Sequence, residues 1–246
     1  MNLLAFVSGS LCIFLLLVVY VVYNFFPKKY TSDTKVTVFI FNNKPSKKLG
    51  FILKTLVEYP NIDQIVVIHF SKNLSTEYNH PKIYCIEDFS EKEKFFKYIK
   101  HIDVVRNEAL LFLDNETLFT NHYLKKILER YDSDIEALYG TTYRLCNNGG
   151  YYKNSLSKNI IHDDILLTSK KVCKNLIREI KAEKSSVQFC QKEHGDFDDI
   201  LFDYLFKKNY NKQPCFVNGK YVHYRKKQES SSFKRKRNDF CKQLHS

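Results

Sequence analysis

Two carboxylates separated by one residue follow a strongly apolar, strand-like run. Asp114 and Glu116 flank Asn115, and the three come directly after Ala109–Leu113, which reads ALLFL. In open α/β sheets, ligands bind beyond the carboxyl ends of the strands. Two acidic side chains in that place supply the oxygen ligands that Mn²⁺ or Mg²⁺ prefers, and a diphosphate would complete the coordination. A surface turn or a helix N-cap is the alternative interpretation of this triplet.

A second acidic group precedes a helix-like apolar run. Asp196, Asp198 and Asp199 stand within the stretch Gly195–Ile200. The helix dipole favours carboxylates at a helix start, which gives them a purely structural explanation. The functional alternative places one of them at a sugar, as a base, a nucleophile or a stabiliser of an oxocarbenium-like transition state.

The C-terminal segment is basic, and the chain as a whole has a formal net charge of +12. Phe233–Arg237 reads FKRKR. A mobile basic segment would close over a diphosphate and stabilise the charge of the leaving group. A solvated chain end and a tail that binds nucleic acid have a similar composition. The chain contains neither G-x-G-x-x-G nor a P-loop pattern, which weighs against NAD enzymes and P-loop NTPases.

Strand-like and helix-like runs alternate along the chain, and this rhythm predicts an α/β fold with a mostly parallel sheet and flanking helices. The expected strands are Lys35–Phe41, Gln64–Phe70, Lys82–Ile86, Ala109–Leu113, Pro214–Val217 and Tyr221–Tyr224. The expected helices are Ser46–Glu58, Glu91–Lys100, Asn121–Tyr131, Thr168–Ala182 and Phe197–Lys208. A hairpin or flap is expected over Tyr143–Lys153, where two Asn and two Gly separate Tyr-rich arms.

The N-terminal segment Leu3–Tyr23 is almost wholly apolar. As a helix it would reach about 31 Å, enough to cross the hydrocarbon core of a bilayer. It lacks the charged start and the small-residue cleavage site of a secretory signal peptide. We therefore expect one transmembrane signal-anchor over residues 1–26, a linker over 27–34 and a single domain over 35–246.

Together these features resemble the exostosin-like glycosyltransferases, a GT-A-fold family that uses Mn²⁺ and UDP-sugars and retains the anomeric configuration. The segments that carry the resemblance are Val36–Lys44, Tyr59–Ile68, Asn107–Leu118, Tyr143–Lys153, Phe197–Ile200 and Arg237–Phe240. The resemblance implies a Rossmann-like GT-A domain. It also implies transfer of an N-acetylhexosamine or a hexuronic acid from a UDP-sugar to a glycan, glycolipid or glycoprotein.

Residue roles follow from this resemblance by position. Asp114 and Glu116 would hold the metal and the diphosphate, with Asn115 between them at the cofactor. The resemblance also gives catalytic roles to Asp199, in the transferase site, and Arg237, near the leaving diphosphate. The positions of the nucleotide pocket correspond to Asn43, Lys44 and Lys97.

Three departures from the family pattern keep other functions open. Asn115 replaces the middle Asp of the family's acidic motif, and Ile165–Ser169 lacks the family's Gly. The two positions of the family's disulfide are here Phe197 and Phe240, which an aromatic contact would join. One alternative is therefore a catalytically inactive GT-A-fold binding protein. The other is a binder of anionic lipid or nucleic acid through the basic tail, although the anchor argues against nucleic acid.

We expect the domain to lie in the lumen of the ER or Golgi, with a domain that faces the cytosol as the alternative. The family precedent favours a type II protein whose domain lies in the lumen of the ER or Golgi. Lys28 and Lys29 follow the apolar segment and favour a domain that faces the cytosol. The sequon Asn115–Thr117 points the same way, because glycosylation there would block the metal site. The seven cysteines include no C-x-x-C pair, and their spacing does not tell which of them form disulfides.

Overall fold

The computed structural model describes residues 3–25, 32–42, 46–72, 78–89, 100–141, 145–147, 150–152, 165–182, 198–219, 221–223 and 231–245. The expected helix Glu91–Lys100 lies outside these residues except for its last one.

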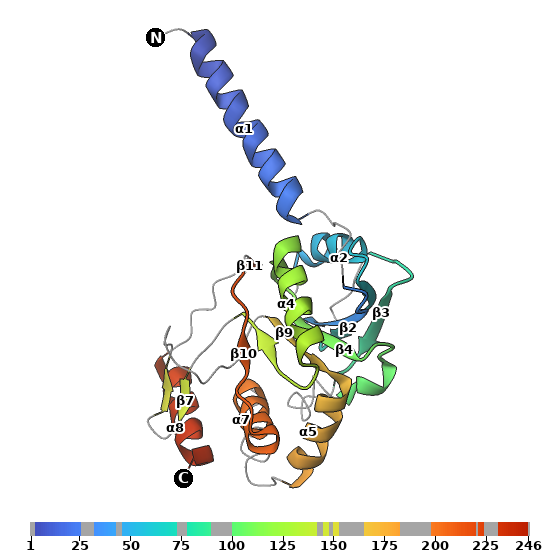
Figure 1. Cartoon of the computed structure of the whole chain (residues 1–246), viewed down its shortest axis with the longest axis vertical. Coiled ribbons are helices and arrows are strands. Elements are labelled where there is room, and N and C mark those ends of the chain that lie inside the picture. Colours follow the sequence, from blue (N-terminus) through green and yellow to red (C-terminus); the bar gives the residue numbers. More distant parts are fainter. Residues whose placement is uncertain are drawn as a thin grey trace.

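Helix α1 (Leu3–Phe25) extends away from the rest of the molecule (Figure 1). The predicted transmembrane anchor is wrong, because no helix in the described part of the chain is both long and apolar enough to cross a membrane. The same finding contradicts the expectation of a single-pass membrane protein, both with a lumenal domain and with a domain that faces the cytosol.

A seven-stranded sheet forms the centre of the domain, in the order β10-β6-β9-β4-β1-β2-β3. Its strands are β1 (Val36–Asn42), β2 (Ile62–His69), β3 (Ile83–Glu87), β4 (Ala109–Asp114), β6 (Tyr139–Gly140), β9 (Ile165–Ser169) and β10 (Cys215–Phe216). Strands β1 to β4 are parallel to one another, whereas β9 is antiparallel to both β4 and β6. The prediction of an α/β fold with a mostly parallel sheet is confirmed.

Two smaller sheets lie beside the main one. Strand β5 (Thr117–Phe119) pairs antiparallel with β11 (Tyr221–His223). Strand β7 (Leu145–Asn147) pairs antiparallel with β8 (Gly150–Tyr152), so the predicted hairpin is confirmed.

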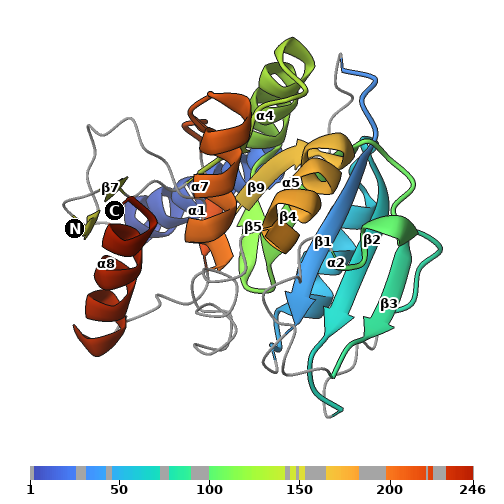
Figure 2. The same cartoon turned by 90° about the horizontal axis from the view of Figure 1, so that it is seen from below.

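Helices cover both faces of the main sheet, and Figure 2 shows α2 and α5 on opposite sides of it. The helices are α2 (Leu49–Val57), α4 (Asn121–Ser133), α5 (Lys170–Ala182), α7 (Asp198–Tyr210) and α8 (Ser231–His245), with a 3₁₀ turn η2 at Ile102–Val104. Alternate residues of β1 enter different cores. Val38 and Ile40 pack with α2 and α4, whereas Phe39 packs with α5 and α7. Burial on both faces explains why the central strands read as continuous apolar runs.

The C-terminal segment is a packed helix. Phe240 and Leu244 of α8 belong to the same core cluster as Ile200 and Phe202 of α7. Cys241 is buried and disulfide-bonded, whereas Cys12, Cys85, Cys173 and Cys215 are not in disulfides. The aromatic position Phe197 lies outside the described residues, so the expected aromatic contact stays a prediction.

Candidate functional site

The turn after β4 carries the two predicted carboxylates. Asp114 ends β4, and Asn115 and Glu116 form the turn into β5. The Glu116 N–H donates to Asp114 Oδ1 at 2.9 Å, which fixes the Asp114 carboxylate against the turn backbone. Both acidic side chains are partly exposed. Because β4 is parallel to β1, β2 and β3, the turn that follows it stands at the carboxyl edge of these strands, where ligands of such folds bind.

Asn115, the residue between the carboxylates, begins a buried hydrogen-bonded chain. Its Nδ2 donates to Asn42 Oδ1 at 3.0 Å, and Asn42 Nδ2 lies 2.9 Å from His69 Nδ1. Asn42 and His69 are the last residues of β1 and β2, so the chain crosses the ends of three neighbouring strands. We refer to Asn115, Asn42 and His69 as the edge network. It anchors the turn to the ends of the neighbouring strands. It also directs the Asn115 amide inward, so this amide is not in a position where a glycan can be attached.

The edge network requires a neutral His69. Asn42 uses its Oδ1 to accept from Asn115, so its Nδ2 donates to His69 Nδ1. An accepting Nδ1 carries no proton, which places the proton of the imidazole on Nε2. Burial lowers the pKa of His69, while the charge of Glu87 acts in the opposite direction. The lowered pKa keeps this imidazole neutral near pH 7, as the hydrogen bond demands.

Asn42→Asp is expected to raise the pKa of His69. A carboxylate still accepts from Asn115, but it faces His69 Nδ1 with an oxygen, which stabilises the imidazolium. An NMR titration of the His69 ring measures the change, and Gln213→Glu, an exposed substitution with the same change in charge, is the control. An unchanged titration in Asn42→Asp would contradict the assigned direction of the hydrogen bonds.

A second polar cluster continues the same edge beyond β3. Asp88 donates its N–H to the carbonyl of His69 at 2.8 Å. The Asp88 carboxylate accepts from Lys100 Nζ at 3.0 Å and contacts His101 Nε2 at 2.8 Å. Sequence reasoning missed Asn42, His69 and this cluster. The available signal was a polar residue that directly ends or follows an apolar run at each of three strands.

The other predicted site residues are less completely placed. Asp199 lies in the first turn of α7, and its side chain is outside the description. Arg237 is on α8 and is only 4% exposed, so it is a buried charge of a helix and not part of a mobile tail. Asn43, Lys44 and Lys97 lie outside the described residues. Asp114, Asn115 and Glu116 thus lie together in one turn. The helices that carry Asp199 and Arg237, α7 and α8, contribute side chains to one hydrophobic core cluster.

The turn suits a metal ion that arrives with a phosphate ligand. Within the described ranges, no group of three or more His, Cys, Asp and Glu side chains is arranged to hold a metal ion. Mg²⁺ commonly binds through one or two carboxylates together with substrate phosphates and water, and does not need a cage made wholly by the protein. Asp114 and Glu116 fit that arrangement because they supply two carboxylates from one fixed turn.

Comparisons with known proteins give a distant structural likeness. No protein-family model matches the chain, and no curated protein matches it. Among solved structures, the chain is similar to 2-C-methyl-D-erythritol 4-phosphate cytidylyltransferase from Francisella tularensis, with a TM-score of 0.48 and 15% identity. The match covers 76% of this chain and 91% of that chain. A likeness this distant assigns no activity, and the exostosin-like resemblance stays a prediction without a matching family model.

Proposed function

We propose that this protein is a metal-dependent transferase that moves a sugar from a UDP-sugar to a glycan, glycolipid or glycoprotein, with retention of configuration. The observation that carries the proposal is the turn Asp114–Glu116. It presents two carboxylates at the carboxyl edge of a mostly parallel sheet, and the hydrogen bonds of the edge network hold it to the ends of β1 and β2.

The proposed roles divide between binding and charge stabilisation. Mn²⁺ or Mg²⁺ bound at this turn would act as a Lewis acid toward the diphosphate. Asp114 and Glu116 hold the ion, while Asn115 acts as a positioning residue through its bond to Asn42. A fixed turn supports this role because a preorganised site loses little free energy to rearrangement during the reaction.

The remaining roles rest on the family resemblance. Asp199, at the start of α7, would stabilise the developing oxocarbenium or orient the acceptor hydroxyl. Arg237, on α8, would stabilise the leaving diphosphate with its charge. Asn43, Lys44 and Lys97 would bind the nucleotide.

A donor panel tests the proposal. The chain is incubated with single UDP-sugars and Mn²⁺, beginning with UDP-N-acetylhexosamines and UDP-hexuronic acids, and released UDP is measured. We expect release from at least one donor, and we expect EDTA to stop it. If no donor is turned over, calorimetry with UDP and Mn²⁺ separates two outcomes. Metal-dependent binding without turnover would identify an inactive binding protein, and the absence of binding would refute a nucleotide site.

A further inference from the structure

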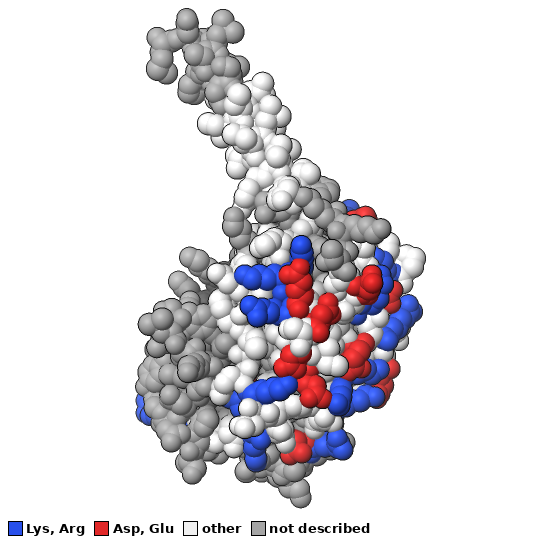
Figure 3. All heavy atoms as spheres, in the orientation of Figure 1, with Lys and Arg blue, Asp and Glu red and all other residues white. Residues whose placement is uncertain are grey.

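A basic hollow lies along α5, on a part of the molecule to which the proposed function gives no role. Its volume is about 660 Å³. Six side chains line it: Glu108, Lys170, Lys171, Lys174, Asn175 and Arg178. Four of these are basic and one is acidic. On the face drawn in Figure 3, Lys and Arg are interspersed with Asp and Glu. In the lining of the hollow, by contrast, basic side chains are in excess.

The hollow is at the opposite edge of the sheet from the acidic turn. Glu108 directly precedes β4, and Lys170 directly follows β9, which runs antiparallel to β4. The Lys170 N–H donates to the Glu108 carbonyl at 2.7 Å and joins the two strand ends. Asp114 lies at the other end of β4, about 20 Å away for six residues at ~3.3 Å each. A ligand in the hollow therefore occupies a site separate from the proposed transferase site.

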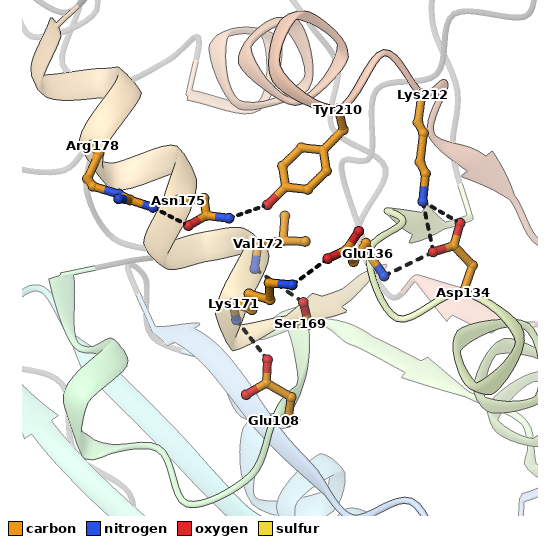
Figure 4. Close-up of polar contacts among 10 residues, drawn as sticks. All are labelled: Glu108, Asp134, Glu136, Ser169, Lys171, Val172, Asn175, Arg178, Tyr210 and Lys212. Atoms are coloured by element: carbon orange, nitrogen blue, oxygen red, sulfur yellow. Dashed lines mark hydrogen bonds and ion pairs between the residues drawn. The ribbon is translucent and has the colours of Figure 1, made fainter.

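The acidic member of the hollow is already engaged by α5. Glu108 Oε1 accepts from the Lys171 N–H at 2.8 Å, in the first turn of the helix. The Lys171 ammonium points to a different partner, Glu136 Oε1, at 2.6 Å (Figure 4). Glu108 is thus hydrogen-bonded to the backbone of α5, and the Lys171 ammonium is engaged with Glu136. The Lys171 charge is paired with Glu136, so three positive charges of Lys170, Lys174 and Arg178 face a ligand together with the one negative charge of Glu108.

These three cations differ in how firmly they are held. Arg178 Nη2 donates to Asn175 Oδ1 at 2.6 Å, and Asn175 Nδ2 donates to the Tyr210 hydroxyl of α7 at 2.8 Å (Figure 4). This chain orients the planar guanidinium before any ligand arrives. Lys170 Nζ donates to the Val105 carbonyl at 3.0 Å, which uses one of its three N–H donors. Lys174 makes no ion pair within the described part of the chain.

We propose that this hollow binds a diphosphate, either free or as part of a nucleotide. An oriented arginine and two lysines on one helix supply several charge-assisted donors to phosphate oxygens, and arginine matches phosphate geometry with two parallel bonds. The volume falls in the range of ~300–1,000 Å³ that is typical of small-molecule sites. The inference does not depend on the proposed transferase activity, because no residue is shared between the two sites.

Calorimetry of the full chain with inorganic pyrophosphate, in EDTA, tests the proposal without a metal at Asp114. We expect saturable binding that Lys174→Gln/Arg178→Gln weakens about tenfold or more, because two charge-assisted partners are lost. The control is Lys125→Gln/Arg130→Gln, which removes one exposed lysine and one exposed arginine from α4. Equal weakening in both variants would show diffuse charge attraction and overturn the proposal, as would unchanged binding in the first.

Milder variants and other anions sharpen the result. Arg178→Lys keeps the charge and the fold but loses the forked geometry of the guanidinium, so we expect a several-fold weaker affinity for pyrophosphate. An unchanged affinity would show that the oriented guanidinium does not contact the ligand. Inorganic phosphate is expected to bind more weakly than pyrophosphate, and equal affinities would overturn the assignment to a diphosphate. UDP that binds as tightly as pyrophosphate supports recognition of the diphosphate alone, and tighter binding of UDP supports a nucleotide.

Discussion

Asp114→Asn/Glu116→Gln is expected to reduce metal-dependent UDP release by about a hundredfold or more. Neutral amides take away both negative ligands of the ion, and the loss of preorganised charge stabilisation has effects of that order. The change is chosen to spare the turn, because Asn retains an Oδ1 that accepts the N–H of residue 116, as Asp114 does now at 2.9 Å. Initial rates of UDP release at saturating Mn²⁺ provide the measurement.

A matched control separates charge at the turn from net charge. Glu129→Gln/Asp239→Asn removes two exposed carboxylates from α4 and α8 and should leave the rate as in the wild-type chain. Full activity in the Asp114/Glu116 variant would refute the metal site. Partial activity that more Mn²⁺ restores would agree with weakened binding of the ion at the same turn.

Asp203→Asn is expected to change how stability depends on pH. Asp203 is buried on α7, its Oδ2 lies 2.6 Å from Lys207 Nζ, and its Oδ1 has no hydrogen-bond partner among the described residues. Burial raises the pKa of Asp203 to about 7 from 3.8, and Lys207 acts against this rise. The free energy of unfolding that this group contributes is therefore complete below its unfolded pKa and is lost as pH rises through about 7.

The amide variant lacks this loss because it does not ionise. The free energy of unfolding of the variant minus that of the wild-type chain should therefore increase between pH 4 and pH 8. The increase should be roughly 1.4 kcal/mol for each unit by which folding shifts the pKa of Asp203. Urea unfolding followed by circular dichroism at several pH values measures the difference. Lys207→Gln should move the loss to higher pH, since it removes the cation that lowers the pKa of Asp203. Parallel pH curves for Asp203→Asn and the wild-type chain would contradict the buried, protonated carboxyl.

The long buried strands were predictable, whereas the direction of β9 was not. The apolar runs of β1, β2 and β4 follow from their burial on both faces, which leaves a clear local pattern. The run of β9 is equally apolar, but an apolar pattern reads the same for either strand direction. β6 has two residues, which is too short for any periodicity to show.

The acidic turn was predictable because its residues are adjacent in the chain, and the edge network was not. Asn42 and Asn115 are 73 residues apart, so only the parallel pairing of β1 with β4 brings them together. The buried position of Arg237 had a local signal. Arg237, Phe240, Cys241 and Leu244 recur at helical spacing and are all buried, as expected for the inner face of an amphipathic helix.

The antiparallel direction of β9 determines where the connection from β6 to β9 meets the sheet. Gly140 of β6 pairs with Leu166, and Ile165 of β9 pairs with Leu113 beside the acidic turn. The connection from β6 to β9 therefore leaves and rejoins the sheet at the edge that carries Asp114. Lengthening a surface connection costs only about 0.6 kcal/mol per doubling. A longer connection between β6 and β9 would therefore change what lies beside Asp114 at little cost in the stability of the sheet.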